Sequence, residues 1–502
     1  MHIAGVDTVF PHTALIEVVT YESPDDMAFD NFAAHLKLVF SDVDSPDHPD
    51  RMSAGQALLI AGFVRTLHEN INTLFVSCEA GMSRSPAIAA AVMLALGGDD
   101  MPIWENPAYS PNGYVYRMVL KAFGLDASGT DEKEAVNLEA WDSRLNTYNY
   151  FGPSPKDIYY SLIGLCVGDA LGVPVEFASR DILDKHPLDD MVGYGTYDKP
   201  PGTWSDDTSM AMALADSLAN GEIDYVGIMN NFTSWLYDGD YTSDGHTFDV
   251  GGMTRRAIKR YSNDVPPLEC GGTAFGDNGN GSLMRILPAA LFLASKYGVI
   301  IDESVIGIIH DLSSMTHAHN ISKIACTIYC NIAFHIMNNM RLFRETGRVP
   351  GADENRRPFL HQTVTLAVQE ACGFYRGKEE YAEDIDIFKR ITSRDFLHYK
   401  REEIKSSGYV VDTLEAAVWC LLNHDDYTGT VLCAVNLGGD TDTTAAIAGG
   451  LAGLLYQNDE GVGIPERWIN EIVNIDLVET ICNRLSKTLC SDQDYYEYWE
   501  ME

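Results

Sequence analysis

The sequence predicts two domains of different fold class: an N-terminal α/β domain, with a central sheet flanked by helices, and a larger all-α C-terminal domain. Strand-like and helix-like apolar segments alternate up to about residue 126, whereas the apolar segments after residue 155 have helical periodicity. The residues between them are polar and acidic and end in Gly-Pro-Ser-Pro. We therefore expect an α/β domain at 1–126, a linker at 127–155, a helical domain at 156–490 and an acidic tail at 491–502.

Composition restricts the partners of the protein. Of its 502 residues, 46% are apolar and 22% charged, as in ordinary globular proteins, and 35 basic against 73 acidic residues give a net charge of −38. Such a surface repels nucleic acid and anionic lipid, so we expect neither as a partner. A phosphate-bearing ligand therefore needs a local binding device.

The cysteines indicate a reduced compartment. All 10 are scattered without a Cys-x-x-Cys pair, and most lie in apolar segments, where a free thiol packs as a small core residue. We identify no basic leader ahead of an apolar run and no uninterrupted apolar stretch of membrane-spanning length. A cytoplasmic location is expected.

In the α/β domain, residues 36–40 and 74–77 are expected to be strands, and residues 54–67 and 86–96 helices. The loop after the second strand reads CEAGMSRS, residues 78–85. Its glycine, its arginine and the next helix N-terminus can surround a tetrahedral anion, and the same positive field favours a thiolate. The loop predicts a phosphate site with a cysteine nucleophile; a buried thiol ahead of a helix is the alternative.

The order Cys78, five residues, Arg84, Ser85 resembles the protein tyrosine and dual-specificity phosphatase family over the predicted α/β domain. The resemblance implies that Cys78 is the nucleophile, that Arg84 holds the phosphate oxygens and that Ser85 helps to turn over the phosphocysteine. This chain departs from the family at Ser77, where the family usually has His. A phosphatase-like module that binds phosphate without turnover therefore stays open.

A phosphatase of this family also needs a general acid, usually an Asp on a loop upstream of the cysteine. The segment FSDVDSPDHPD offers Asp42, Asp44 and Asp47. We favour Asp42, because it directly follows the predicted strand, and keep Asp44 as the close second.

The helical domain contains long periodic segments, and its chemistry is expected in the loops at their ends. The predicted helices are residues 159–171, 208–218, 306–340, 360–374 and 414–422. One of these loops, LGGDTDTTAAIAGGLAG, sets Asp440 and Asp442 on either side of Thr441 ahead of an alanine-rich helix. One acid is enough to cap a helix, whereas two acids followed by Thr443 offer the hard oxygen ligands that Mg²⁺ prefers.

Two other loops repeat this pattern. GTWSDDTSMAMAL places Ser205, Asp206 and Asp207 at the head of a helix, and GLCVGDALGVPVEFASR leaves Glu176 just beyond a proline. With Asp440 and Asp442 these acids form a set that would repel one another without cations, and two Mg²⁺ ions would nearly balance their charge. The sequence therefore predicts a binuclear cation site.

Five motifs in order resemble the ADP-ribosylglycohydrolase family, which includes the dinitrogenase reductase-activating hydrolases. They are GDALGVPVEF, GTWSDDTSM, NGNGSLMRILP, SSGYVVDTLEAAVWCL, and LNHDD with AVNLGGDTDTTAAIAGGLAGLLY. The resemblance implies an all-α fold, two Mg²⁺ or Mn²⁺ ions, and hydrolysis of the N- or O-glycosidic bond between ADP-ribose and a protein side chain. It implies cation ligands at Ser205, where the family usually has Thr, and at Asp206, Asp207, Asp440, Asp442 and Thr443, with Glu176 near the cations.

Such a site has to stabilise an oxocarbenium-like sugar and activate water on its far side. We nominate Asp207 or Glu176 as the base. The glycines of NGNGSLMR let the backbone at Asn280, Gly281 and Ser282 approach the diphosphate, with a plain glycine turn as the alternative.

Two further residues are candidates for substrate binding. His317 in MTHAHN matches a family position near the ligand, with a core histidine as the alternative, and Tyr409 in SSGYVVDT can stack on adenine. The leading hypothesis is a bifunctional hydrolase that acts on an ADP-ribosylated protein or ADP-ribose derivative and on a phosphorylated substrate. The alternative is an ADP-ribosylglycohydrolase with a non-catalytic, phosphate-binding reader module.

Overall fold

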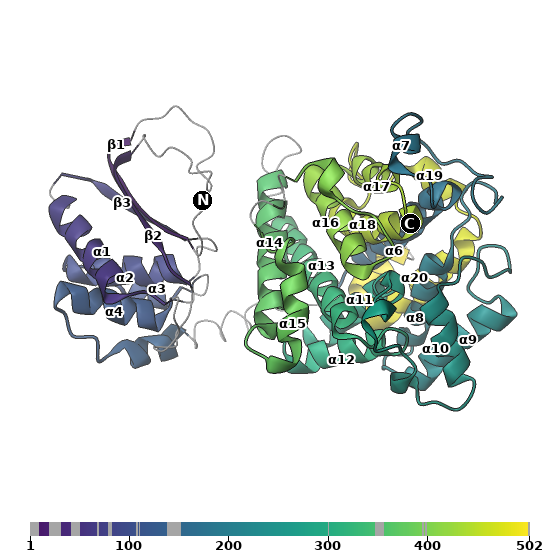
Figure 1. Cartoon of the computed structure of the whole chain (residues 1–502), viewed down its shortest axis with the longest axis horizontal. Helices are drawn as coiled ribbons and strands as arrows, with labels where there is room; N and C mark the ends of the chain where they lie inside the picture. The colour runs from purple at the N-terminus through teal and green to yellow at the C-terminus, as the bar shows by residue number, and fades with distance from the viewer. Residues whose placement is uncertain are drawn as a thin grey trace. The chain divides into compact units, whose positions relative to one another are not determined.

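The computed structural model describes residues 10–19, 32–41, 51–67, 70–78, 83–106, 109, 111–137, 152–299, 301–346, 356–393, 396 and 399–499. Its contacts divide the chain into two compact units, Met1–Asn149 and Tyr150–Glu502, and each has its own hydrophobic core (Figure 1).

The N-terminal unit contains a parallel sheet of three strands in the order β2-β1-β3. The strands are β1 (Phe10–Val19), β2 (Phe32–Val39) and β3 (Thr73–Cys78), and the helices are α1 (Ala54–Leu67), α2 (Arg84–Ala95), α3 (Met101–Trp104) and α4 (Gly113–Phe123). Ile16 and Val18 of the central strand are fully buried with Ile60 of α1 and Ile88 of α2. The sheet is therefore covered by helices, as parallel sheets require.

The N-terminal unit continues beyond residue 126 into the segment predicted as a linker. Residues 130–137 are helical. Lys133 Nζ lies 2.6 Å from Asp100 Oδ1, and Asn137 Nδ2 donates to the carbonyl of Trp104 at 2.8 Å. These two contacts hold a polar, acidic stretch against the domain, which composition alone did not reveal.

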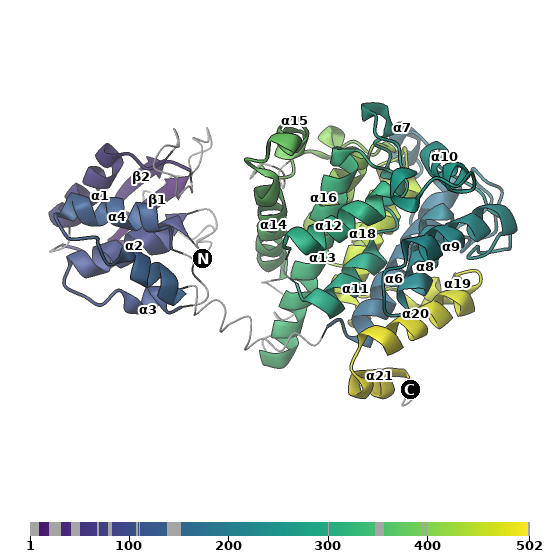
Figure 2. The same ribbon diagram turned by 90° about the horizontal axis from the view of Figure 1, so that it is seen from below.

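The C-terminal unit is helical, as predicted. Its helices are α6 (Pro155–Gly172), α7 (Arg180–Leu183), α8 (Asp206–Leu218), α9 (Tyr225–Asp238), α10 (Gly252–Tyr261), α11 (Leu287–Tyr297), α12 (Glu303–Ser314), α13 (Asn320–Thr346), α14 (Arg356–Tyr375), α15 (Ala382–Ile385), α16 (Val410–Asn423), α17 (Tyr427–Asn436), α18 (Thr441–Tyr456), α19 (Glu466–Glu471), α20 (Ile475–Leu489) and α21 (Asp492–Trp499). Helices α13, α16 and α18 contact one another, and α18 also packs along α6 (Figure 2).

Two expectations about this unit were wrong. The predicted helix at 306–340 is broken into α12 and α13. The chain turns at residues 315–319, where His317 pairs through its backbone with Gly272. The predicted acidic tail at 491–502 contains α21, whose Trp499 lies edge-on to Tyr159 of α6 with ring centroids 5.9 Å apart. Aromatic packing thus orders a segment that its charge suggested was a tail.

Helix α6 is also more apolar than the sequence analysis allowed for. Together with the following turn, Pro155–Val175 is long and apolar enough to span a membrane. However, 78% of its most apolar window is buried inside the C-terminal unit. The segment is therefore accounted for as the core helix around which the unit packs.

Glycines bring the backbones of α6 and α18 into direct contact. A Cβ at Gly168 would lie 2.2 Å from the carbonyl oxygen of Ala445, and one at Gly164 would lie 2.4 Å from that of Gly449. No side chain larger than hydrogen fits at either position without moving one helix. The N-terminus of α18 is thereby held beside the C-terminal end of α6.

We expect Gly168→Ala to separate α6 from α18 and to destabilise the protein by about 1–3 kcal/mol or more, the usual cost of overpacking a core. Chemical denaturation followed by circular dichroism measures the change. Gly307→Ala on α12 is the matched control, because nothing lies within 4 Å of its Cβ position and alanine favours a helix by about 1 kcal/mol. Equal stability of the two variants would contradict the role of this contact.

Candidate active site

The first group of acids lies at the N-terminus of α8. Ser205 caps this helix, its Oγ accepting from the backbone N–H of Asp207, and Asp206 and Asp207 occupy the first turn. Asp169 of α6 accepts from the backbone N–H groups of Ser205 and Thr208, each at 3.0 Å, and from the Thr208 hydroxyl at 2.6 Å. Asp169 thus fixes the start of α8 against α6 and sets the direction of the two acids.

The second group lies at the N-terminus of α18. Gly438 and Gly439 both have left-handed backbones, with φ of 75° and 77°. A Cβ at Gly439 would lie 2.3 Å from the Ser406 carbonyl oxygen, so the loop requires glycine here. After this turn, Asp440 and Asp442 enter the site, and the Thr443 hydroxyl donates to Asp207 Oδ2 at 3.3 Å.

The acids from α8, α18 and the turn after α6 have the features of a cation site. Glu176, Asp207, Asp440 and Asp442 each have one buried carboxylate oxygen without a hydrogen-bond partner among the described residues. One oxygen each from Glu176, Asp440 and Asp442 lie within 4.8 Å of one another, as do those of Asp169, Asp207 and Asp442. Unpartnered buried carboxylate oxygens are costly, and carboxylate oxygens are the ligands that hard divalent cations prefer. The residues therefore fit divalent cations.

The electrostatics of the cluster agree with this interpretation. Burial, followed by the negative charge of Asp249, raises the pKa of Glu176 to about 9. Burial and neighbouring acids also raise the pKa values of Asp207 and Asp442 well above their usual range, and burial raises that of Asp169 to about 6. Without cations, several of these carboxyl groups must hold protons at neutral pH.

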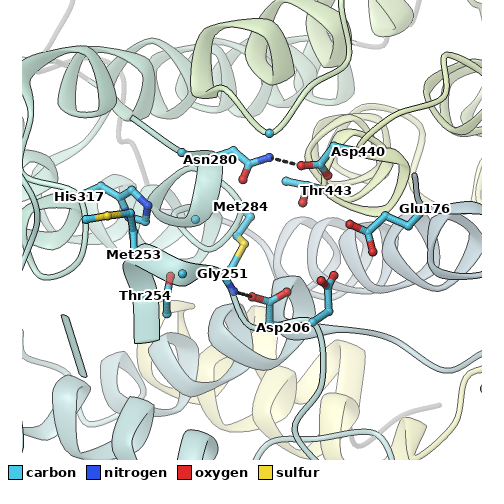
Figure 3. Close-up of a pocket in the computed structure, with 15 residues that line it drawn as sticks. Glu176, Asp206, Gly251, Met253, Thr254, Asn280, Met284, His317, Asp440 and Thr443 are labelled. Carbon is cyan, nitrogen blue, oxygen red and sulfur yellow. Dashed lines mark hydrogen bonds between the residues drawn. The ribbon is translucent and has the colours of Figure 1, made fainter. Parts of the chain in front are cut away.

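A cleft of about 280 Å³ opens onto this cluster (Figure 3). Its acidic end is formed by Glu176, Asp206, Asp249 and Asp440, together with Thr443. No lysine or arginine is among the described residues that line the cleft. The acidic end is therefore suited to cations and to a positively charged group of a substrate.

The opposite end of the cleft is formed by backbone and by a neutral histidine. Gly279 and Gly281 line it with His317, which is 2% exposed. Burial and the charge of Arg285 lower the pKa of His317 to about 3, so its imidazole is uncharged. We call the loop at residues 279–281 the glycine loop. The buried Arg285 donates to the carbonyls of Gly281 and of Leu312 in α12, and so joins the glycine loop to that helix.

The predicted substrate-binding residues differ in whether they line the cleft. Asn280 lines the cleft, but its Nδ2 donates to Asp440 Oδ2 at 3.0 Å, which ties the glycine loop to the acidic cluster (Figure 3). Ser282 is fully buried and accepts from the Ser313 hydroxyl at 3.0 Å, away from the cleft. Tyr409 pairs with Gly279 through the backbone and precedes α16, and its neighbour Gly408 is the residue that lines the cleft.

Sequence reasoning missed three residues in or beside the cluster, namely Asp249, Tyr197 and Asp169. Asp249 lines the acidic end and has a left-handed backbone with φ of 52°. The Tyr197 hydroxyl donates to Asp249 Oδ1 at 2.5 Å. Both lie in loops without periodicity, so no pattern pointed to them. Asp169 was also missed, although a single acid in an otherwise apolar helix was a usable signal.

The N-terminal unit places Cys78 at the carboxyl end of β3 and Arg84 at the start of α2. Cys78 Sγ lies 3.1 Å from Ser85 Oγ and accepts from the backbone N–H of Ser85 at 3.4 Å. The buried Arg84 donates from Nη1 to the carbonyl of Phe40 at 2.7 Å. The candidate general acids, Asp42, Asp44 and Asp47, lie outside the described residues.

Comparisons with known proteins cover the region that contains the cleft. A family model described as ADP-ribosylglycohydrolase matches residues 156–494. ADP-ribosylarginine hydrolase Tri1 of Serratia proteamaculans (strain 568) is 31% identical over 332 residues, covering 65% of this chain and 77% of that protein. ADP-ribosyl-(dinitrogen reductase) glycohydrolase of Rhodospirillum rubrum is 31% identical over 331 residues, covering 64% and 92%. A solved structure described as an ADP-ribosylglycohydrolase-related protein complex aligns with a TM-score of 0.50 at 26% identity, over 67% of this chain and 99% of that one.

We expect the cation-free protein to lose stability as the pH rises from about 5 to 9. The raised pKa values mean that the folded state binds more protons than the unfolded state in this range, so the free energy of unfolding falls by about 1.4 kcal/mol per pH unit for each proton involved. Saturating Mg²⁺ or Mn²⁺ should remove most of this dependence. Urea denaturation across the range, with chelator or with cation, measures both effects.

The control for this experiment is a pair of variants. Glu176→Gln removes one buried acid and should flatten the pH dependence in chelator, whereas Glu460→Gln changes an exposed acid and should leave it unchanged. A stability that is independent of pH in chelator, or that does not respond to cation, would contradict the cation site.

Proposed function

The chain belongs to the ADP-ribosylglycohydrolase family, and we propose that its helical unit hydrolyses the N-glycosidic bond between ADP-ribose and an arginine side chain of a protein. The observation that supports this proposal most directly is the group of buried acids at one end of the cleft, with their unpartnered oxygens. Cations held there can bind the hydroxyls of the ribose whose bond is cleaved, and the remaining cleft can accept the diphosphate.

Arginine is favoured as the modified residue for two reasons. The acidic end carries Asp249 beside Glu176, and no lysine or arginine is among the described residues that line it, so it suits a guanidinium group better than a neutral hydroxyl. Two of the similar proteins are, by their names, ADP-ribosylarginine hydrolases.

The cations of this site are proposed to be two Mg²⁺ ions, with Mn²⁺ as a substitute. When bound, such ions polarise the ribose hydroxyls and lower the pKa of bound water. Ser205, Asp206 and Asp207 from α8 would hold them together with the acids and Thr443 of α18. The carboxylates and hydroxyls of this set are oxygen ligands, which Mg²⁺ and Mn²⁺ prefer.

Of the two nominated bases, the geometry supports Glu176. Glu176 lines the cleft and has an unpartnered oxygen, so it can accept the proton of an attacking water. Asp207 is 1% exposed, and its Oδ2 accepts from the hydroxyls of Ser205 and Thr443, which fits a cation ligand better than a proton acceptor.

At the other end, the glycine loop and His317 would accommodate the diphosphate. Gly279 and Gly281 let the backbone approach closely. Because His317 is neutral, it can donate or accept a hydrogen bond there without adding charge.

We expect the purified protein to release ADP-ribose from arginine-ADP-ribosylated protein in the presence of Mg²⁺ and not in chelator. Glu176→Gln should lower kcat by about 10²–10⁴-fold, the usual contribution of a general base, and leave cation binding largely intact. Asp207→Asn should instead weaken cation binding, measured by calorimetry. Glu460→Gln serves as the control with unchanged turnover. Absence of ADP-ribose release with either cation would overturn the proposal.

For the N-terminal unit we propose cysteine-dependent hydrolysis of phosphomonoesters. The position of Cys78 at a strand end, in hydrogen-bond contact with Ser85 and ahead of a helix that begins at Arg84, supports it. The bond from Arg84 to the Phe40 carbonyl occupies part of the guanidinium in this structure, which supports the alternative of a module that binds phosphate without turnover.

An aryl phosphate assay separates the two alternatives. We expect turnover that Cys78→Ser abolishes, because a hydroxyl is a far weaker nucleophile than a thiolate. Arg84→Lys should raise KM, because an ammonium cannot hold phosphate bidentately. Phosphate binding without turnover would favour the reader module, and turnover that survives Cys78→Ser would remove the nucleophile assignment.

A further inference from the structure

Exposed apolar side chains are concentrated in the stretch of sequence that follows Glu176. Between residues 152 and 499, ten large apolar side chains are exposed among the described residues, and four of them lie within a stretch of 18 residues. They are Phe177 (69% exposed), Ile182 (54%), Val192 (41%) and Tyr194 (67%), and we call the two aromatic residues, Phe177 and Tyr194, the mouth patch. Single exposed apolar residues are ordinary, but a gathering of them is typical of a binding surface.

The mouth patch adjoins the cleft directly. Phe177 follows Glu176 in the chain. The segment of Tyr194 is joined to the same place, because Thr196 donates from its hydroxyl to the Glu176 carbonyl at 2.7 Å and from its N–H to the Pro174 carbonyl at 3.0 Å. Phe177 is therefore the chain neighbour of the acid that lines the cleft, and the segment just after Tyr194 is hydrogen-bonded to the same backbone.

The patch is held rigidly. The Phe177 N–H donates to the Gly439 carbonyl at 2.7 Å, which anchors it to the loop that carries Asp440. Arg180 donates to the carbonyls of Leu437 at 2.8 Å and of Arg401 and Ile404 at 2.7 Å each. An exposed side chain on a firmly anchored backbone requires less ordering of the chain when a partner covers it.

The two aromatic residues also have an unfavourable backbone. Phe177 and Tyr194 both have left-handed conformations, with φ of 63° and 61°, which bulky residues rarely adopt. Their anchors hold them there although glycine or asparagine would fit with less strain. Residues kept in such conformations are found mainly at functional sites.

The charge around the patch indicates the kind of partner. Asp198 is exposed next to Tyr197, and Asp249 and Glu176 line the adjacent cleft, while Lys199 is paired with Asp244 at 2.6 Å. A surface of aromatic side chains beside acids fits a cationic segment, because arginine stacks on aromatic rings and pairs with carboxylates.

We propose that the mouth patch docks the protein part of the substrate: a basic, arginine-containing segment whose modified side chain enters the cleft while its neighbours cover Phe177 and Tyr194. The inference rests on the proposed hydrolysis and adds to it a means of recognising the protein beyond its ADP-ribose group. The patch contributes to binding of protein substrates and not to the chemistry.

The test compares two substrates: a small basic protein ADP-ribosylated on arginine, and ADP-ribosylated agmatine, which carries the guanidine on a short aminobutyl chain and no polypeptide. The variants are Phe177→Asn, Tyr194→Asn and the double variant, because asparagine tolerates the left-handed backbone. Tyr237→Asn, which removes a 59% exposed aromatic residue on α9, is the matched control.

The double variant should raise KM for the modified protein by about 10-fold, as loss of a central interface residue does, with kcat unchanged. Its kcat/KM for ADP-ribosylated agmatine should stay within about 2-fold of wild type, and Tyr237→Asn should change neither. Equal losses on both substrates would show that the residues only shape the cleft, and unchanged KM for the protein would show that nothing docks on the patch.

A binding measurement keeps this test independent of turnover. In an Asp440→Asn background, calorimetry should show that the added Phe177→Asn and Tyr194→Asn substitutions weaken binding of the modified protein. If the wild type hydrolyses neither substrate, the proposed function is wrong. The calorimetric affinity for the modified protein still shows whether Phe177 and Tyr194 contribute to docking. If the substitutions instead convert a dimer to a monomer in sedimentation, the patch pairs two copies of this chain and the docking proposal is overturned.

Discussion

The geometry of the site depends on the backbone contact between α6 and α18. Glycines on both helices remove the side chains that would otherwise keep two helices 8–10 Å apart. The Thr441 hydroxyl can then donate to the Gly172 carbonyl at 2.8 Å, across the ends of the two helices. Asp169 of α6 and Asp442 of α18 consequently meet in the interior, and the acids of α8 are placed through Asp169.

The same arrangement concentrates negative charge at the inner, acidic end of the cleft. Most core residues of the C-terminal unit are fully buried apolar side chains, and the acids occupy one end of this core. Unpaired buried carboxylates lower the stability of the fold, so packing does not account for them, whereas their arrangement could hold divalent cations. Glycine-rich contacts, left-handed turns and buried acids are all unfavourable locally, and they occur together around the cleft.

The sequence was informative where a feature is periodic or repeated. Helix α1 matches its predicted bounds, because its apolar spacing continues from Ala54 to Leu67. The acids at the starts of α8 and α18 could be assigned to one site, because both loops place two acids and a hydroxyl residue at the start of a helix. The break between α12 and α13 could not be predicted, since the apolar spacing continues across it and only the contact of His317 with a distant loop ends the helix. Asp249 and Tyr197 act through contacts between loops, for which sequence spacing gives no signal.

The hydrogen bond between Asn280 and Asp440 connects the two ends of the cleft. Asn280 belongs to the glycine loop at one end of the cleft, and its amide also donates to the Thr413 hydroxyl at 3.1 Å, so one side chain joins the loop, α16 and an acid of the cation cluster. Whatever orders the loop also orders Asp440. The position of the loop is therefore coupled to that of Asp440, and by thermodynamic linkage any coupling between ligands at the two ends of the cleft is equal in both directions.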